Sequence, residues 1–119
     1  MKYALDVHTH TIVSGHAYST LMENAKAASE KGIKVLGTTE HGCMMPNAPH
    51  IWYFNNYKVL PREMYGVTML YGVEANILNH DGKMDMDDKT LEKVDIVIGS
   101  IHEPIYNMGS VEENTRADR

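Results

Sequence analysis

Four short, mostly apolar segments of the chain each end at a side chain that can bind a metal ion, and this arrangement constrains the fold most. The segments and the residues that follow them are 3–7 with His8 and His10, 34–39 with His41, 67–73 with Glu74, and 95–100 with His102. Apolar runs of this length that break into polar residues are typical of buried parallel strands. Because such strands end at one edge of a sheet, we expect the metal-binding side chains to converge there.

The segments between the strands predict helices, and so a β/α alternation. Thr20 and Glu23 have the spacing of a capping box, and Gly32 would end the helix that they begin. Asp87 or Asp88 would cap a second, short helix before the last strand. We therefore expect an α/β fold with about four parallel strands joined by right-handed crossovers.

Two stretches of the sequence do not predict a complete helix or strand. Residues 44–61 are expected to form a long loop, in which the aromatic residues 52–54 pack against the body of the domain. Residues 110–119 resemble the first turns of a helix, but no stop signal follows. The chain has 119 residues, whereas a closed β/α barrel needs roughly 250. We interpret residues 1–119 as a single domain that is truncated at its C-terminus.

Composition and charge exclude several classes of protein. Hydrophobic residues make up 43% of the chain and charged residues 23%, as in folded globular domains. The net charge of -5 argues against a nucleic-acid partner, because no positive field attracts phosphate backbones. The single cysteine, Cys43, forms no internal disulfide and is expected to be a small packed side chain. No apolar N-terminal stretch predicts a signal peptide or membrane span, so we expect a cytoplasmic protein without a membrane partner.

The candidate ligands combine imidazole and carboxylate donors, and they are His8, His10, His16, His41, Glu74 and His102. Such a set suits zinc first, with manganese or iron(II) as alternatives, whereas calcium and magnesium prefer sites dominated by oxygen. A carboxylate such as Glu74 can bridge two cations, which activate water and clamp the oxygens of a phosphoryl group. The pattern predicts a polynuclear site in which metal-activated water, rather than a protein nucleophile, attacks the substrate.

Six ordered motifs span nearly the whole chain: DVHTHT at 6–11, SGHAYST at 14–20, TEHG at 39–42, APH at 48–50, GVEANI at 72–77 and SIHEP at 100–104. Together they resemble the PHP-domain family, named for polymerase and histidinol phosphatase, and within it the YcdX-type phosphatases. The resemblance implies the N-terminal half of a distorted (β/α)7 TIM-like barrel. It also implies up to three metal ions, usually zinc, and the hydrolysis of phosphate esters.

The resemblance also implies a role for each ligand. His8 and His10 would bind a first metal, which Glu74 bridges to another. The second metal would take His16 and His41, and the third would take His102 with Glu74. The family draws a further histidine, and later an aspartate and a histidine, from the second half of its barrel, and this sequence ends before all three. We therefore expect partial occupancy and unpaired barrel edges, with a homo-oligomer as one way to cover them.

Five more residues are candidates for contact with the substrate or with a ligand. Asp6 would orient a ligating histidine, and Glu40 stands where the family more often has aspartate. His50 would contact either the substrate or a backbone group of its own loop. Arg62 would meet a substrate phosphate or serve as a structural anchor. Glu103 is either a general acid or base or a solvated residue at a strand end.

These patterns predict a metal-dependent phosphoester hydrolase, a phosphatase that acts on a phosphorylated small molecule. Two alternatives stay open. The first is an inactive metal-binding half-domain, which could assemble with a second copy. The second is a nuclease or proofreading PHP domain of a DNA polymerase, which the acidic balance disfavours. Activity is expected of the parent protein and is left open for the 119-residue chain itself.

Overall fold

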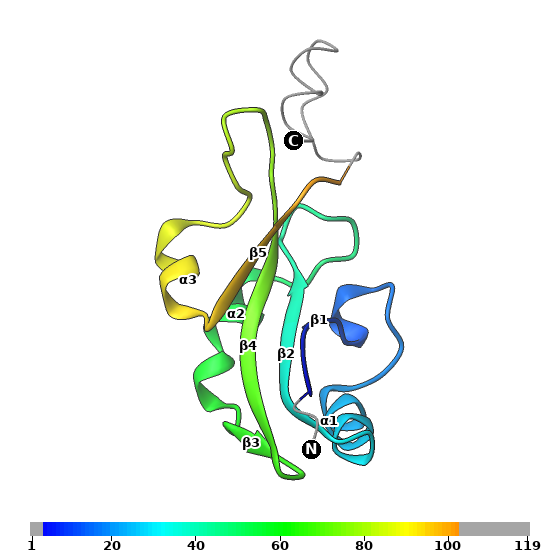
Figure 1. Ribbon diagram of the computed structural model, residues 1–119. Coiled ribbons are helices and arrows are strands. Elements are labelled where there is room, and N and C mark those ends of the chain that lie inside the picture. Colours follow the sequence, from blue (N-terminus) through cyan, green and yellow to red (C-terminus); the bar gives the residue numbers. More distant parts are fainter. Residues whose placement is uncertain (1–3, 103–119) are drawn as a thin grey trace.

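The computed structural model describes residues 4–102, and its centre is a sheet of four parallel strands (Figure 1). These strands are β1 (Ala4–Thr9), β2 (Ile33–His41), β4 (Val67–Asn76) and β5 (Ile96–Ser100), in the spatial order β1-β2-β4-β5. A two-residue strand, β3 (Glu63–Met64), pairs antiparallel with the start of β4. The predicted α/β fold with four parallel strands is confirmed, and the open sheet with its helices matches one part of a TIM-like barrel.

The strand β4 organises the core because its two faces have different surroundings. Its odd-numbered residues are apolar and almost completely buried, and they are Val67, Met69, Tyr71, Val73 and Ala75. Successive side chains of a strand alternate between faces, so Glu74 and Asn76 point to the opposite side. Both polar residues are nonetheless buried. A buried carboxylate on the central strand requires partners, and these define the candidate site.

Helix α1 (Leu21–Glu30) confirms the predicted capping box. The Thr20 hydroxyl accepts a hydrogen bond from the Glu23 backbone N–H at 3.2 Å, and the Glu23 carboxylate accepts one from the Thr20 N–H at 2.8 Å. Ala25 and Ala28 bury one face of the helix in the core. The second predicted helix is α3 (Asp88–Lys93), with Asp87 rather than Asp88 as its cap.

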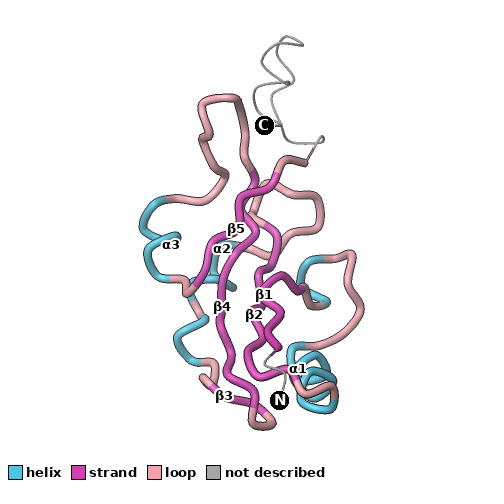
Figure 2. The backbone as a smooth tube through the Cα atoms, viewed as in Figure 1, coloured by secondary structure: helices cyan, strands magenta, loops and turns pink. Residues whose placement is uncertain are grey.

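The prediction of an unbroken loop over residues 44–61 is wrong. This segment contains a short helix, α2 (Ile51–Asn55), and a 3-10 turn, η2 (Tyr57–Val59), which the tube view separates from the loops around them (Figure 2). Another 3-10 turn, η1 (Ile12–Ser14), follows β1. Within the aromatic cluster, Phe54 is buried as predicted, whereas Trp52 is 76% exposed and does not anchor the segment. Tertiary burial of Phe54 and Tyr57, not local sequence preference, stabilises this short helix.

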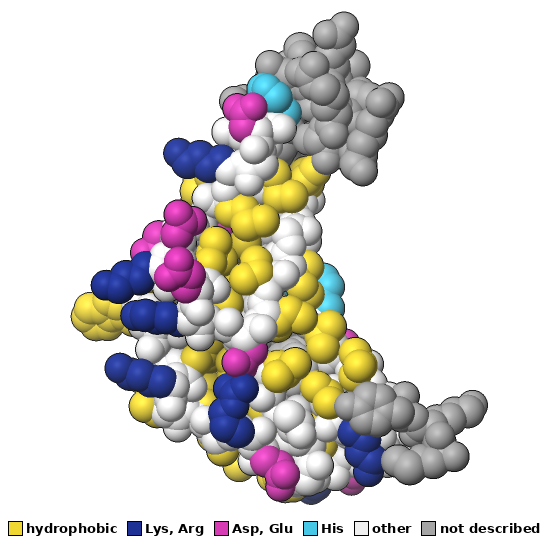
Figure 3. All heavy atoms as spheres, turned by 60° about the vertical axis from the view of Figure 1, so that its left-hand side comes forward, with side chains coloured by type: hydrophobic (Ala, Val, Ile, Leu, Met, Phe, Trp, Pro, Cys, Tyr) yellow, Lys and Arg dark blue, Asp and Glu magenta, His cyan; other side chains and the backbone are white. Residues whose placement is uncertain are grey.

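The edges of the parallel sheet carry exposed apolar side chains. Within the described residues, β1 pairs only with β2, and β5 pairs only with β4. Leu5 on β1 and Val97 on β5 are among the exposed large hydrophobic residues. Figure 3 shows hydrophobic side chains gathered in a band along one face of the molecule. Apolar edge strands of this kind suit further chain packing against them.

The helix predicted from Ser110 and the role considered for Glu103 lie outside residues 4–102. None of the helices in the described part of the chain has the length and apolar character needed to cross a membrane.

Candidate metal centre

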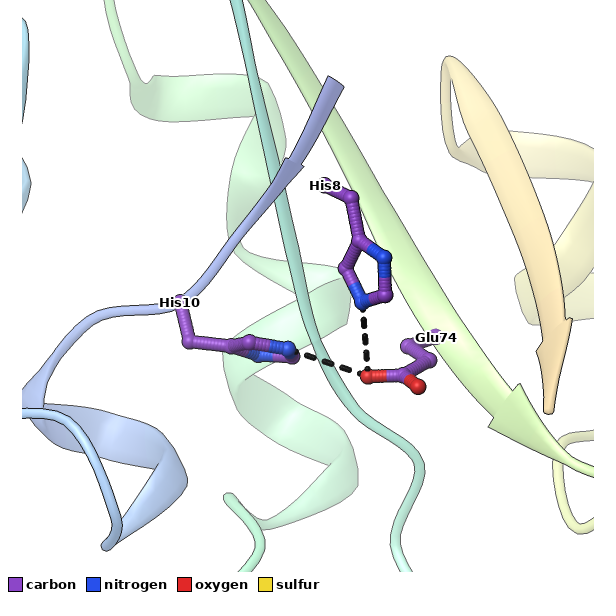
Figure 4. A group of neighbouring side chains, drawn as sticks. All are labelled: His8, His10 and Glu74. Atoms are coloured by element: carbon purple, nitrogen blue, oxygen red, sulfur yellow. Dashed lines mark ion pairs between the residues drawn. The ribbon is translucent and has the colours of Figure 1, made fainter. Parts of the chain in front are cut away.

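Four histidines surround the carboxylate of Glu74 at the C-terminal edge of the sheet. His8 lies in the last two residues of β1, and His10 is the first residue beyond that strand. Their Nε2 atoms lie 3.1 and 3.0 Å from Glu74 Oε1 (Figure 4). His41 Nδ1 lies 3.3 Å from the same oxygen, and His102 Nε2 lies 3.6 Å from Oε2. Residues from both ends of the described chain thus meet around one carboxylate, as the parallel topology requires.

Strand register explains the position of Glu74 among these rings. In the β2–β4 ladder His41 is paired directly with Glu74, and the Gly42 N–H donates to the Glu74 carbonyl oxygen at 2.9 Å. In the β4–β5 ladder Glu74 is paired with Ile98. The strand β5 ends at Ser100, and His102 follows shortly after it. The carboxylate therefore stands at the centre of the sheet edge, with ligands from both neighbouring sides.

The four imidazole rings form a continuous row. The His10 and His41 rings are stacked with centroids 4.3 Å apart and planes 13° from parallel. His8 meets His10 edge-on at 5.3 Å, and His102 meets His41 edge-on at 5.2 Å. Exposure differs along the row, since the His8 side chain at one end is 49% exposed and that of His41 inside the row is 11% exposed. The site is open to solvent on the His8 side and enclosed at His41.

The donor atoms fit divalent metal ions. His8, His10 and Glu74 place one ligand atom each within 4.8 Å of one another, and His41, Glu74 and His102 form a second such group. Glu74 belongs to both groups. Glu74 Oε1 and His41 Nδ1 are buried, and neither makes a hydrogen bond with a described residue. Unpaired buried polar atoms cost roughly 1–3 kcal/mol each, so a cation between them would relieve a real penalty.

Electrostatics around His41 and Glu74 favour the forms of these two residues that bind metal. Burial lowers the pKa of His41, and the charges of His10 and other neighbouring histidines lower it further. Burial raises the pKa of Glu74, but the contacts with the Ser100 and His8 side chains and the charges of the nearby imidazoles outweigh this effect and hold the pKa below its ordinary value. A neutral imidazole and an ionised carboxylate are the ligand forms that coordinate a cation.

Glu40 lies directly behind His10 and is completely buried. Its carboxylate accepts hydrogen bonds from the Thr11 N–H at 3.0 Å, from the Thr11 hydroxyl, and from the Ser14 hydroxyl at 2.6 Å. His10 Nδ1 lies 3.7 Å from Glu40 Oε1, and the interaction with this carboxylate raises the pKa of His10. The Ser14 oxygen also accepts the backbone N–H of His41 at 3.1 Å. One buried carboxylate therefore holds the loop after β1 against β2 and faces the far nitrogen of a candidate ligand.

Two further residues predicted from the sequence, Asp6 and His16, lie near the centre and outside its two donor groups. Asp6 was expected to orient a histidine ring, yet its carboxylate accepts a hydrogen bond from the backbone N–H of His8 at 3.2 Å. Short side chains such as aspartate readily accept hydrogen bonds from nearby backbone N–H groups, and Asp6 therefore stabilises the backbone at His8. His16 belongs to neither donor group, although its charge contributes to lowering the pKa of His41.

The remaining predicted residues lie in structural contacts. His50 caps α2, because its Nδ1 accepts a hydrogen bond from the Trp52 N–H at 3.1 Å. Arg62 forms an ion pair with Asp95 at 2.9 Å and stands over the ring of Tyr71. In each case the structural alternative from the sequence describes the contact observed. Half-buried Cys43 packs against the core, which also agrees with its predicted packing role.

Sequence reasoning missed Asn76 and Asp85. Asn76 Oδ1 lies 2.6 Å from His102 Nδ1, and Asn76 Nδ2 lies 2.5 Å from Asp85 Oδ2. A signal for Asn76 was present, since asparagine is disfavoured in strands and this one lies two residues after Glu74, on the same face. Asp85 carries no comparable signal, because its partner is set by the path of the chain between residues 77 and 86.

Comparison with known proteins places the chain among phosphatase-like sequences. The profile of the PHP domain matches residues 6–119. The chain is 64% identical over 117 residues to a probable phosphatase of Clostridium novyi. It is 56% identical to one of Clostridium botulinum and 48% identical to one of Photobacterium profundum. Each alignment covers 98% of this chain and 48% of the relative, so the chain spans about half the length of the curated relatives it matches.

Proposed function

Because the chain belongs to the PHP domain family, we propose that it supplies a ligand cluster of a metal-dependent phosphoester hydrolase. The observation that carries this proposal is the convergence of four histidines on Glu74, whose Oε1 is buried without a hydrogen bond to a described residue. Relatives that match over nearly the whole chain are named probable phosphatases, which supports the same reaction class. The activity proposed is that of the full-length protein that contains this chain.

The proposed site is polynuclear. His8, His10 and Glu74 would hold one ion, and His41, Glu74 and His102 would hold another, with Glu74 shared between them. Zinc is the first choice for a set rich in imidazole, and manganese or iron(II) are the alternatives. His16 lies close enough to influence the pKa of His41, and we propose that it joins His41 as a ligand of the second ion.

Divalent cations, when bound here, supply Lewis acidity that activates water and offsets the charge of a phosphoryl group. The chain's own residues prepare the site for this chemistry. Glu40 faces Nδ1 of His10, the ring nitrogen that points away from Glu74, and would help to orient the ring. Burial lowers the pKa of His41 and so favours the neutral imidazole, which can coordinate a cation. Glu74 stays ionised because its neighbours outweigh the effect of its burial. The half-exposed His8 marks the side from which a substrate phosphate would enter.

We propose a phosphorylated small molecule as the substrate. The net charge of -5 gives no extended positive surface for a nucleic-acid backbone, so recognition rests on the phosphate and the cations. The nuclease alternative therefore lacks an observation in its favour. The inactive half-domain remains a second candidate for the isolated chain, because the chain spans about half of its relatives.

Hydrolysis of p-nitrophenyl phosphate tests the proposal. The full-length protein is stripped with a chelator, assayed, and assayed again after zinc is restored, while the 119-residue chain is treated in parallel. We expect activity in the full-length protein that disappears on stripping and returns with zinc. Activity that is indifferent to stripping would refute metal dependence. Zinc binding without turnover by the isolated chain would assign it the half-domain role.

A further inference from the structure

We propose that Asn76 and Asp85 are positioning residues that hold the His102 proton on Nδ1 and so keep its Nε2 lone pair free for a cation shared with Glu74. This inference rests on the proposed function, since it concerns the same candidate metal centre. Neither residue is a candidate ligand. Both act on the centre through the far side of one imidazole ring.

The contact between Asn76 and His102 is short and enclosed. Asn76 Oδ1 lies 2.6 Å from His102 Nδ1, and Asn76 is completely buried. At this separation one of the two atoms must donate a hydrogen, because two lone pairs would repel. Which atom donates depends on which end of the Asn76 amide faces the ring.

Asp85 fixes the orientation of that amide. Its Oδ2 lies 2.5 Å from Asn76 Nδ2, and its Oδ1 accepts the backbone N–H of Asn76 at 2.8 Å. A carboxylate only accepts hydrogen bonds, so the NH2 end of Asn76 must face Asp85. The carbonyl end then faces His102, whose Nδ1 must donate. The neutral ring has its lone pair on Nε2, the atom 3.6 Å from Glu74 Oε2.

The chain takes a specific path to bring Asp85 to this place. After β4 it leaves the sheet, turns at residues 79–82, and returns through a bridge between Ile77 and Met84 (Figure 1). The return is completed by the Asp85 N–H, which donates to the Asn76 carbonyl oxygen at 3.1 Å. This excursion places one carboxylate behind the asparagine that faces His102.

The loop after β2 holds Asp85 from the other side. Met44 N–H donates to Asp85 Oδ2 at 3.0 Å, and the Gly42 carbonyl oxygen accepts a weak hydrogen bond from Asn76 Nδ2 at 3.4 Å. A Cβ atom at Gly42 would overlap the Asp85 carboxylate. Glycine directly after His41 thus permits the close approach of the carboxylate that orients the His102 partner. The loops that follow β2 and β4 thus both hold Asp85 in the position that favours the Nδ1–H tautomer of His102.

The test uses the full-length protein with 15N-labelled histidine. NMR reports which nitrogen of His102 carries the proton in the metal-free state, and calorimetry reports zinc affinity. Asp85→Asn replaces one of the two accepting oxygens with a donating NH2 group, so the Asn76 amide is no longer held in one orientation. The matched control is Asp87→Asn, which makes the same change nearby in the chain and leaves a good cap on α3. The double variant Asn76→Asp with Asp85→Asn exchanges amide and carboxylate, so an acceptor faces His102 again.

We expect the Nδ1–H tautomer in the unmodified protein and in Asp87→Asn. In Asp85→Asn we expect the Nε2–H tautomer to appear and zinc affinity to fall about 10- to 100-fold, as for other residues that orient metal-binding histidines. The double variant should recover both properties. A purely structural role predicts no change of tautomer in folded Asp85→Asn, and that result would overturn the inference.

The other outcomes are equally decisive. If Asp85→Asn does not fold, the double variant carries the test: Nδ1–H with near-normal zinc affinity supports the inference, and Nε2–H overturns it. If the unmodified protein shows Nδ1–H that Asp85→Asn abolishes, yet binds no zinc, the positioning inference stands while the proposed function fails.

Discussion

Glu74 Oε1 lies 3.3 Å from His41 Nδ1, and both atoms are buried without a hydrogen bond among the described residues. Paired strand register brings the two residues together, since His41 and Glu74 are partners in the β2–β4 ladder. Folding therefore buries two polar atoms next to each other without giving either a hydrogen-bond partner among the described residues. This relationship has consequences for stability as well as for chemistry.

Zinc should stabilise the protein. A ligand that binds only the folded state adds free energy of unfolding that grows with its concentration, by roughly 2.7 kcal/mol at one hundred times Kd. Thermal unfolding of the metal-stripped full-length protein, measured with increasing zinc, should give a rising Tm. Magnesium serves as the control because it prefers oxygen ligands and should shift Tm much less. Equal shifts with both ions would argue against an imidazole-rich site.

Glu40→Gln should destabilise the protein in a pH-dependent way. Burial raises the pKa of Glu40, but the nearby His10 ring and the hydrogen bonds from Ser14 and Thr11 outweigh this effect and lower the pKa overall. A carboxyl group with a lowered folded pKa contributes stability above its ordinary value of 4.5, and that contribution is lost as the pH falls through the folded pKa.

At neutral pH we expect Glu40→Gln to cost on the order of 1–3 kcal/mol in denaturant unfolding. The difference between the two proteins should shrink as the pH falls below 4.5. Glu63→Gln, at an exposed position on β3, is the control and should change little at either pH. A difference that stays constant with pH would contradict an ionised role for Glu40.

Gly72→Ala should disturb the pairing that carries His102 to the site. A Cβ at Gly72 would collide with the backbone oxygen of Ile96, its partner in β5, so the two strands would have to separate. We expect a loss of about 1–3 kcal/mol in unfolding free energy and weaker zinc binding. Gly99→Ala is the matched control, because its Cβ would meet only flexible side-chain ends of Met84 and Ile77. Equal costs at both glycines would contradict this account.

His50 should be replaceable without loss of hydrolysis. Its ring caps α2, so His50→Ala should cost about 1 kcal/mol of stability, and His50→Asn should restore most of that because asparagine is a good cap. Both variants should retain phosphatase activity in the full-length protein. A large drop in turnover by folded His50→Asn would instead favour the substrate contact that the sequence left open.

Much of this fold is predictable because its signals are local. Each parallel strand contains an apolar run that gives way to polar residues near its C-terminal end, and the capping box of Thr20 and Glu23 is readable from spacing alone. Convergence of the ligands then follows from parallel topology, since strand ends share an edge. Helix α2 escaped prediction because a histidine ring is its cap and the burial of Phe54 is tertiary.

The residues that contact the candidate ligands are harder to predict from the sequence than the candidate ligands themselves. Glu74 is recognisable because a carboxylate follows an apolar strand, whereas Asp85 acquires its role only when the chain returns to Asn76. Asp6 has the chemistry to orient an imidazole but turns to a nearby backbone N–H. Which of several acceptors reaches a given ring depends on loop paths that a single sequence does not specify.

Zinc titration calorimetry of the metal-stripped full-length protein, compared with Glu74→Gln, tests the central claim most directly. Gln keeps the shape of the side chain but removes the charge shared by both ligand groups. We predict that Glu74→Gln lowers zinc affinity at least about 10-fold or reduces the number of zinc ions bound, while Glu92→Gln, at an exposed position on α3, leaves both unchanged. Identical zinc binding by the unmodified protein and a folded Glu74→Gln variant would contradict a metal centre built around Glu74.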